Sequence, residues 1–293
     1  MKLREVEADA EAIFSIALKT VQNGMEQDAK QTDADFLNAD GLLMCGTCKT
    51  PKQMMIDVPY VGQRVVPIMC KCAQERRAQE EARNKAAEEQ ERINAMRRMG
   101  ITNSLYAEMT FANDDGQDQR MSAIARRYVE KRSEMLKENI GLLLHGGVGG
   151  GKTFFAACIA NAMIDNGYSA LITTIPELIS AMTKDYESEK AHILEKIRRV
   201  KFLVLDDVGF ERTSSYGHEK IYEIINARYM AGKPLIVTTN LSLQEIENPS
   251  SMDYKRPFDR LLEMCQPIHV SGEGRRKAIG REKGQRAREI LGL

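Results

Sequence analysis

Short apolar runs alternate with longer amphipathic segments along the chain from Ile101 onward. The apolar runs are rich in Leu, Ile and Val, as in buried strands, and cover 141–144, 170–174, 201–205 and 235–238. The segments between them have helical periodicity and cover about 118–138, 154–164, a helix opened by Pro176, 187–199 and about 216–231. This alternation predicts an α/β domain with a mostly parallel sheet and helices on both faces.

The first hundred residues have a different pattern. Residues 1–35 carry a mixed apolar stripe, which predicts a helix that either packs on its own domain or docks a partner. Residues 36–72 are rich in Gly, Pro and Cys. Residues 73–98 are almost all Ala, Glu, Arg, Gln and Lys with opposite charges four residues apart, which predicts an exposed connecting helix ending at Gly100. We therefore expect an N-terminal module over 1–72, a linker helix over 73–100 and an α/β domain over 101–293.

Composition narrows the function classes. The 293 residues include 42 basic and 42 acidic side chains, so no global field attracts nucleic acid and any DNA contact needs a local patch. The sequence has no apolar run near 18 residues and no hydrophobic signal core at its start, so we expect neither a membrane span nor secretion. Free-thiol chemistry in its six cysteines is typical of the reducing cytoplasm.

A glycine-rich motif follows the first apolar run of the α/β domain. Residues 146–153 match G-x-x-x-x-G-K-[ST], the phosphate-binding P-loop, and stand between a predicted strand and a predicted helix. Backbone amides of such a loop cradle phosphate oxygens, the lysine reaches the β- and γ-phosphates, and the threonine hydroxyl binds Mg²⁺. The predicted ATP-binding residues are Gly146, Gly147, Val148, Gly149, Gly150, Gly151, Lys152, Thr153 and Phe154.

Polar side chains end two further predicted strands. Asp206 and Asp207 follow the apolar run 202–205 and occupy the Walker B position of a P-loop protein. We expect Asp206 to bind Mg²⁺ directly or through water, and Asp207 to orient or deprotonate the attacking water. Asn240 ends the next strand and can place an amide beside the γ-phosphate, with Thr239 as second candidate; the alternative for Asn240 is a simple turn.

Four cysteines form a second candidate site. Cys45, Cys48, Cys70 and Cys72 have the spacing C-x2-C-x21-C-x-C, which matches a tetrahedral structural zinc site without an open coordination position. A redox dithiol and an iron–sulfur cluster are the alternatives. A module this small has little core, so bound metal would supply much of its folding free energy. The remaining cysteines, 158 and 265, lie in apolar helical contexts and are expected in the core.

Together these features resemble AAA+ ATPases, and among them bacterial replicative helicase loaders of the DnaC/DnaI type and related transposition helper ATPases of the IstB type. The resemblance covers about residues 101–280. It rests on Gly146–Thr153, Leu205–Gly209 with Glu211 after it, Ile224–Tyr229, Thr238–Leu241 and Gly272–Arg276. The metal-binding module joined by a helix is more similar to the DnaI-type loaders. With 53 residues after Asn240, we expect the helical lid domain of this fold to be absent or minimal.

The resemblance assigns further roles. It makes Arg256 an arginine finger that acts on a neighbouring subunit, with Arg260 beside it, although Pro257 is unusual after a finger. It makes Arg276 the sensor 2 arginine and leaves Arg275 one residue out of register. Asp207 stands where many AAA+ proteins have Glu, which fits slow, switch-like hydrolysis.

The resemblance also implies partners. It places single-stranded DNA on the helical segment 175–199, whose basic and aromatic residues are Lys184, Tyr186, Lys190, Lys196, Arg198 and Arg199, diluted by five acids. The expected function is ATP-dependent loading of a replicative hexameric DNA helicase onto single-stranded DNA. Self-association would occur through the ATPase domain, and the N-terminal module would grip the helicase. The alternatives are an IstB-like transposition helper and a nucleotide-switched adaptor with little hydrolysis.

Overall fold

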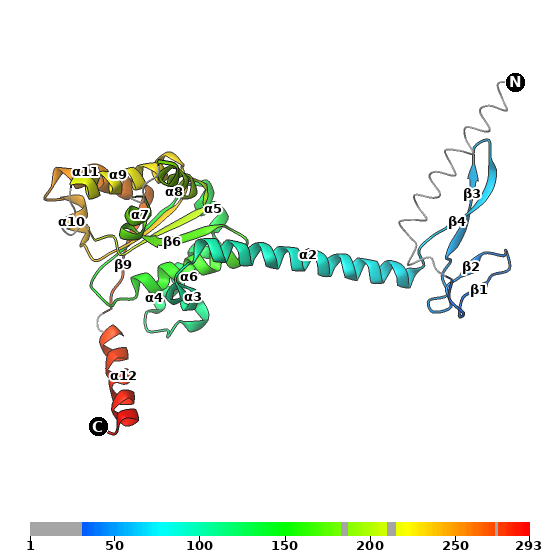
Figure 1. The fold of residues 1–293 in the computed structure, drawn as a ribbon, viewed down its shortest axis with the longest axis horizontal. Helices are drawn as coiled ribbons and strands as arrows, with labels where there is room; N and C mark the ends of the chain where they lie inside the picture. Colours follow the sequence, from blue (N-terminus) through cyan, green and yellow to red (C-terminus); the bar gives the residue numbers. More distant parts are fainter. Residues whose placement is uncertain (1–30, 183–186, 210–214, 273–274) are drawn as a thin grey trace. The chain divides into compact units, whose positions relative to one another are not determined.

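The computed structural model describes residues 31–182, 187–209, 215–272 and 275–293 (Figure 1). The chain divides into two compact units between Glu89 and Gln90. The helix predicted over 1–35 lies mostly outside the described residues, and its last part is wrong, because residues 31–35 form a turn. Among the described residues, no helix combines the length and apolarity that crossing a membrane requires.

The first unit contains two small antiparallel hairpins that present the cysteines. Strands β1 (Phe36–Leu37) and β2 (Leu43–Met44) form one, and β3 (Gln53–Val58) and β4 (Gly62–Pro67) form the other. Helix α2 (Lys71–Gly100) follows directly and is exposed through most of its length, with an i,i+4 ion pair between Arg77 and Glu81. Its end at Gly100 agrees with the sequence.

The last turns of α2 belong to the second unit, which begins at Gln90. Ile93 and Met96 pack against the core of that unit. The guanidinium of Arg97 donates to Oδ1 of Asn161 at 2.5 Å and pairs with Asp165. The last turns of α2 are therefore attached to the rest of the second unit by both apolar packing and charge.

A five-stranded parallel sheet forms the centre of the second unit. Its strands are β5 (Gly141–His145), β6 (Ala170–Thr174), β7 (Phe202–Asp206), β8 (Leu235–Thr239) and β9 (Cys265–His269), in the order β6-β7-β8-β5-β9. The helices are α3 (Ser104–Glu108), α4 (Gln119–Glu130), α5 (Arg132–Lys137), α6 (Lys152–Asp165), α7 (Ile175–Met182), α8 (Glu187–Arg199), α9 (Ser215–Met230), α10 (Leu243–Glu247), α11 (Met252–Met264) and α12 (Arg275–Leu291), with a 3-10 turn at Phe111–Asn113.

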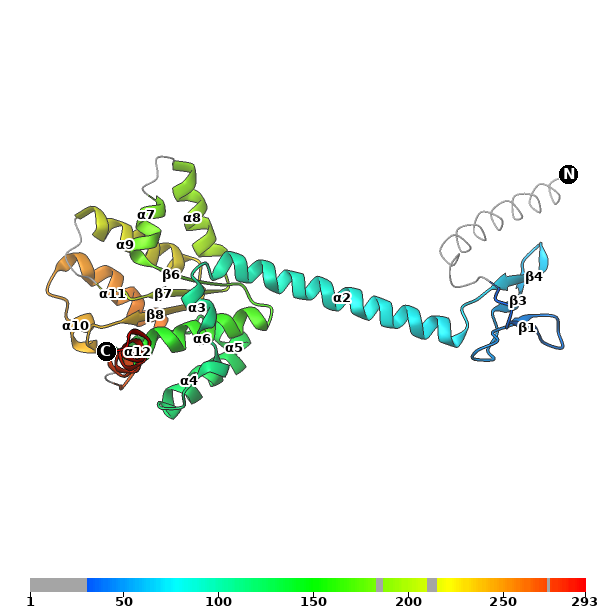
Figure 2. The same ribbon diagram turned by 60° about the horizontal axis from the view of Figure 1, so that its bottom comes forward.

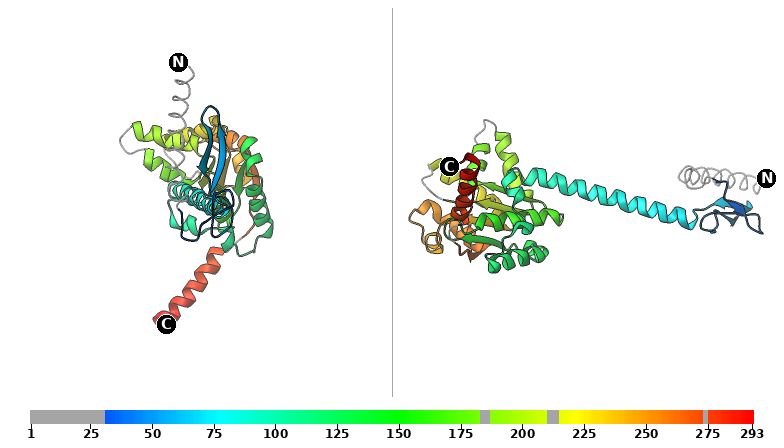
Figure 3. Two further views of the ribbon diagram at one scale, coloured as in Figure 1. Left: turned by 90° about the vertical axis from the view of Figure 1, so that its right-hand side faces the viewer. Right: turned by 90° about the horizontal axis from the view of Figure 1, so that it is seen from below.

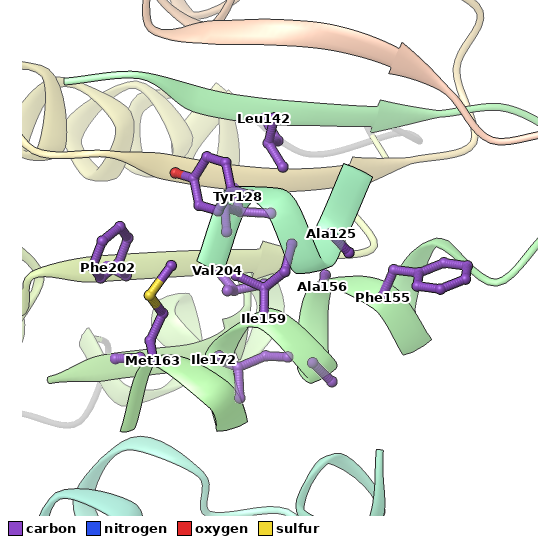
Figure 4. Packing of buried hydrophobic residues seen from close by; sticks show 14 of the residues in the cluster. Ala125, Tyr128, Leu142, Phe155, Ala156, Ile159, Met163, Ile172, Phe202 and Val204 are labelled. Atoms are coloured by element: carbon purple, nitrogen blue, oxygen red, sulfur yellow. The ribbon is translucent and has the colours of Figure 1, made fainter. Parts of the chain in front are cut away.

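Helices cover both faces of the sheet, as Figures 1 and 2 show, and a separate hydrophobic core lies on each face. Alternate strand residues such as Leu142 and Val204 face α4 and α6, while Leu143 and Leu205 face α7, α8, α9 and α11. Figure 4 shows the first core, where Ile159 of α6 lies close to the strand residues. The predicted architecture, a parallel sheet flanked by helices, is confirmed. Among the described residues, helix α12 follows β9.

Two local predictions were wrong. The single helix expected over 118–138 is two helices, α4 and α5, because the Arg132 guanidinium donates to the Val129 carbonyl at 3.2 Å and so caps the end of α4. The sequence also gave no sign of β9, which contains Pro267 and lies at the edge of the sheet, where a missing N–H is tolerated. Cys265 is buried as expected, but at the start of this strand.

Candidate functional site

The loop 146–151 joins β5 to α6 at the carboxyl edge of the sheet. Its glycines are required where the chain turns close to β9. Gly146 has φ +140°, and a Cβ there would stand 2.6 Å from the Val270 carbonyl oxygen; a Cβ on Gly150 would stand 3.1 Å from that of Gly272. The loop ends at Gly151, directly before the first turn of α6, so amides at the helix N-terminus face the loop interior.

The ammonium of Lys152 points into this loop. It donates to the carbonyl oxygens of Gly146 and Gly147 at 2.9 and 2.7 Å, and to Oδ1 of Asn240 at 2.9 Å. Lys152 is buried, and these oxygen atoms compensate its positive charge. Phosphate oxygens would bind the ammonium more strongly than carbonyl oxygens do, because they carry negative charge.

The two acids after β7 occupy different environments. Asp206 is 5% exposed, and its Oδ1 accepts a hydrogen bond of 2.6 Å from the Thr238 hydroxyl. Asp207 has φ +50°, which turns the chain sharply at the strand end, and its Oδ1 accepts from Nδ2 of Asn240 at 3.1 Å. The separation of the two carboxylates therefore comes from a left-handed residue, a conformation that Asp tolerates better than most side chains.

These elements surround one pocket of about 350 Å³. Its described lining joins the loop, the Asp207 and Asn240 strand ends and a segment that precedes β5: Met109, Asn113, Asp115, Val148, Gly149, Gly150, Gly151, Lys152, Thr153, Phe154, Asp207, Thr238 and Asn240. The volume suits a small-molecule ligand. Asn240 lies here because β8 stands between β7 and β5.

Sequence reasoning missed the wall formed by residues 106–115. Tyr106 of α3 donates its hydroxyl to Oδ2 of Asp206 at 3.0 Å, and burial beside that carboxylate raises the pKa of Tyr106. Nδ2 of Asn161 in α6 fixes this wall by donating to the carbonyls of Tyr106 and Met109 at 2.8 and 3.0 Å. No motif marks these residues; only the fold brings them to the acids.

None of the arginines predicted to act on the nucleotide lines this pocket in the part of the chain that the structure describes. Arg256 is exposed on α11, in a surface hollow that it shares with His218 and Tyr222. Arg260 is occupied within its own subunit: it donates to Oδ1 of Asn226 at 2.6 Å and covers the ring of Tyr222. The side chains of Arg275 and Arg276 lie outside the described residues.

The expected DNA-binding helices show mostly internal contacts. Lys190 pairs with Glu223 at 2.8 Å, and Lys196 donates to the Met99 carbonyl at 2.9 Å. Arg199 pairs with Glu195 at 2.7 Å, while Arg198 is exposed. Lys184 and Tyr186 lie outside the described residues.

The four cysteines of the first unit meet as predicted. Their Sγ atoms all lie within 4.8 Å of one another, with 3.4 Å between Cys70 and Cys72 and 3.6 Å between Cys45 and Cys72, and none forms a disulfide. Four thiolates at about 2.3 Å from zinc stand about 3.8 Å apart, so the cluster fits a tetrahedral ion. The Thr50 hydroxyl and nearby amides lower the pKa of Cys48, while burial raises the pKa of Cys70 and the neighbouring thiols raise that of Cys72.

Similarity to known proteins agrees with this geometry. The chain is 29% identical over 149 residues to the replicative helicase loader DnaI of Bacillus subtilis, a stretch of 46% of this chain and 47% of the relative. It is 30% identical over 126 residues to the replicative helicase loader DnaC of Escherichia coli K12, covering 42% and 50%. It is 27% identical over 159 residues to a putative insertion sequence ATP-binding protein of Sinorhizobium fredii, covering 52% of each chain.

The chain thus spans about half the length of the curated relatives it matches. Among solved structures, a crystal structure of DnaI aligns over 59% of this chain and 96% of that chain, with 27% identity and a TM-score of 0.48. The family described as IstB-like ATP binding protein matches residues 74–283, more than two-thirds of the chain and all of the pocket. A phosphate loop, Asp207 and a polar strand end line one pocket within the matched residues. The chain belongs to the IstB-like ATP-binding family.

Proposed function

We propose that this protein hydrolyses ATP to load a replicative hexameric DNA helicase onto single-stranded DNA. The observation that carries the ATPase part is the convergence of Lys152, Asp207 and Asn240 on one pocket. The relatives that are named replicative helicase loaders support a helicase as the partner of this protein. A role in loading this helicase implies that the protein works in the cytoplasm.

The pocket residues divide the chemistry between them. Lys152 would give up its carbonyl partners for the β- and γ-phosphates, and Thr153 and Asp206 would hold Mg²⁺, which neutralises phosphate charge. Asp207, held by the Asn240 amide, would orient the attacking water and accept its proton. Asp207 has a shorter side chain than Glu and lies in a left-handed turn of the backbone. This suits slow ATP hydrolysis that sets the moment at which the loader is released.

Self-association would complete the site. The developing charge on the transferred phosphoryl group requires cations beyond Lys152. Arg256 is exposed and does not line the pocket of its own chain in the described structure, so it would serve a neighbouring subunit. Arg276 would act as sensor 2 on the nucleotide.

The N-terminal unit would recognise the helicase. Zinc bound by Cys45, Cys48, Cys70 and Cys72 would hold its hairpins in place, with a structural rather than catalytic role.

The test is affinity capture with the purified full-length chain in a lysate of its source, with ATP, followed by identification of bound proteins by mass spectrometry. We expect a replicative helicase to be recovered. Capture should fall when Cys70 and Cys72 are changed to Ser, and its dependence on ATP should disappear in Lys152→Ala. Recovery of no helicase with either nucleotide condition would overturn the loading role.

A transposition helper is the second candidate. The Sinorhizobium fredii relative favours it, since that protein is named a putative insertion sequence ATP-binding protein. The family match, described as IstB-like ATP binding protein, is compatible with the same function. Recovery of a transposase, together with preference for duplex DNA, would select this function. ATP binding without turnover, with normal capture, would instead identify a nucleotide-switched adaptor.

A further inference from the structure

Helix α12 carries a large excess of basic over acidic residues. The whole chain has 42 basic and 42 acidic residues, and α12 holds seven of the basic but only two of the acidic ones. The rest of the chain therefore carries five more acidic than basic residues. A helix of 17 residues is about 25 Å long, so this segment is a dense positive rod on an otherwise acidic protein.

The described side chains of α12 face solvent. Arg281, Lys283, Arg286 and Arg288 are all exposed, and Figure 3 shows the α12 ribbon near the C-terminus. Arg286 pairs with Glu289 at 3.3 Å. Within the described residues, the side chains of Arg281, Lys283 and Arg288 have no ion-pair partner, so three cations per helix are available to an external anion.

Unlike most described cations of α12, three basic side chains of α8, the other candidate DNA-binding helix, have partners within the chain. There, Lys190, Lys196 and Arg199 are each engaged by an acid or a carbonyl of the same chain. A DNA phosphate would have to displace these partners, at a cost in free energy. The cations of α12 need no such exchange.

The chemistry of α12 fits a nucleic acid backbone better than a membrane surface. Five of its seven cations are arginines, whose planar forks bind phosphate oxygens in pairs. The helix has no aromatic residue and few large apolar ones, whereas helices that lie on membranes need a broad apolar face. Along a B-form strand, about 25 Å corresponds to roughly seven phosphates.

We infer that α12 binds the phosphate backbone of single-stranded DNA without reading its sequence. The inference rests on the proposed loading function for the identity of the nucleic acid. It gives the protein a DNA contact outside the nucleotide pocket.

The test compares two triple variants of the full chain in fluorescence anisotropy with labelled oligodeoxythymidine over a salt series. The first changes Arg281, Lys283 and Arg288 to Gln, which removes charge but keeps helix propensity. The matched control changes Arg76, Arg83 and Lys85, all exposed on α2, to Gln, so that net charge falls equally.

Each phosphate contact contributes about 0.7 to the slope of log affinity against log salt, so the α12 variant should lose about two units of slope. Its affinity at about 0.1 M salt should fall roughly 100-fold, and the control should stay within about threefold of the unchanged protein. ATP affinity should be the same in all three proteins.

Equal losses in both variants, or no loss in the α12 variant, would overturn the inference. So would a variant that binds DNA normally but no longer captures the helicase, because α12 would then be a protein-docking helix. Helicase capture by the unchanged chain is measured separately, so failure of the loading role is distinguishable from failure of this inference.

Discussion

The phenolic hydroxyl of Tyr106 lies 3.0 Å from Oδ2 of Asp206 and donates to it. Both side chains are buried, and the other carboxylate oxygen is held by Thr238 at 2.6 Å. Since Asn161 fixes the Tyr106 backbone and also accepts from Arg97, the hydrogen bonds run from the end of α2 to the acid expected to bind Mg²⁺.

Tyr106→Phe should weaken the binding of Mg²⁺ at the nucleotide site. A buried hydrogen bond to a charged group contributes about 1.5–3 kcal/mol, so the Mg²⁺ concentration for half-saturation should rise about tenfold or more. ATP affinity without Mg²⁺ should change little. Titration of a fluorescent ATP analogue with Mg²⁺ measures both.

Tyr128→Phe is the matched control for this prediction. Its hydroxyl donates to the Ile140 carbonyl at 2.7 Å in the same core, away from Asp206. If both variants shift the Mg²⁺ curve equally, Tyr106 has a general packing role and does not position the acid.

Hydrolysis should be restored by mixing two inactive variants. Lys152→Ala disables a subunit's own pocket, while Arg256→Ala removes the cation offered to a neighbour, so each alone should lose at least about 100-fold in rate. In an equal mixture, about a quarter of head-to-tail interfaces have both groups intact. Steady-state phosphate release should recover toward that fraction. A mixture no faster than its parts would place Arg256 outside the trans site.

Removal of metal should unfold the first unit and leave nucleotide binding intact. We expect one zinc per chain by elemental analysis, and loss of that zinc in Cys70→Ser. Cys158→Ala, which changes a buried thiol of α6, should keep it. Removal of zinc by a chelator should make residues 36–72 sensitive to protease. Thiolate–zinc bonds stabilise this unit in place of a hydrophobic core. Metal content unchanged in Cys70→Ser would contradict the four-cysteine site.

Asp35→Asn should loosen the cysteine turn. Asp35 accepts from the Lys52 ammonium at 2.8 Å and from the Gly46 amide, between the first two cysteines, at 2.9 Å. The Lys52 contact and these amides lower the pKa of Asp35, so its ionised form stabilises the fold above its unfolded pKa of about 3.9. Urea unfolding should therefore find the variant weaker at neutral pH, with the difference shrinking as the pH falls through the acid range. A constant difference would contradict a charge effect.

Arg228→Ala should destabilise the second unit strongly. Arg228 is 0% exposed and donates to four carbonyls, including Ile197 at 2.9 Å and Lys201 at 2.8 Å, which joins the end of α8 to α9. Burial lowers its pKa to about 9, so it remains charged at neutral pH. Losing it leaves several buried carbonyls unpaired and a cavity, at a cost of roughly 3–5 kcal/mol.

Lys233→Ala provides the comparison for Arg228. Lys233 donates to the Arg198 and Arg199 carbonyls at 2.8 and 3.0 Å but is only half-buried, so its loss should cost under about 1 kcal/mol. Similar stability of both variants in thermal unfolding would mean that the buried arginine does not anchor α8.

The sequence by itself determined the phosphate loop, the acids after β7 and the cysteine set, because each depends on residues at short, fixed spacing. It also determined the parallel sheet, since apolar runs mark buried strands wherever they fold. For Asn240 the sequence left two interpretations open, a place in the pocket and a simple turn, because spacing alone does not show which strand ends meet.

Only the tertiary structure decided which distant groups touch these motifs. Tyr106 stands 100 residues before Asp206, and β9 has too little apolar character to be seen before its neighbour β5 is in place. The partners of the α8 cations are likewise distant in sequence: Lys190 pairs with Glu223, and Lys196 donates to the Met99 carbonyl at the end of α2. Such contacts join segments far apart in the chain, and local spacing carries no information about them until the sheet has formed.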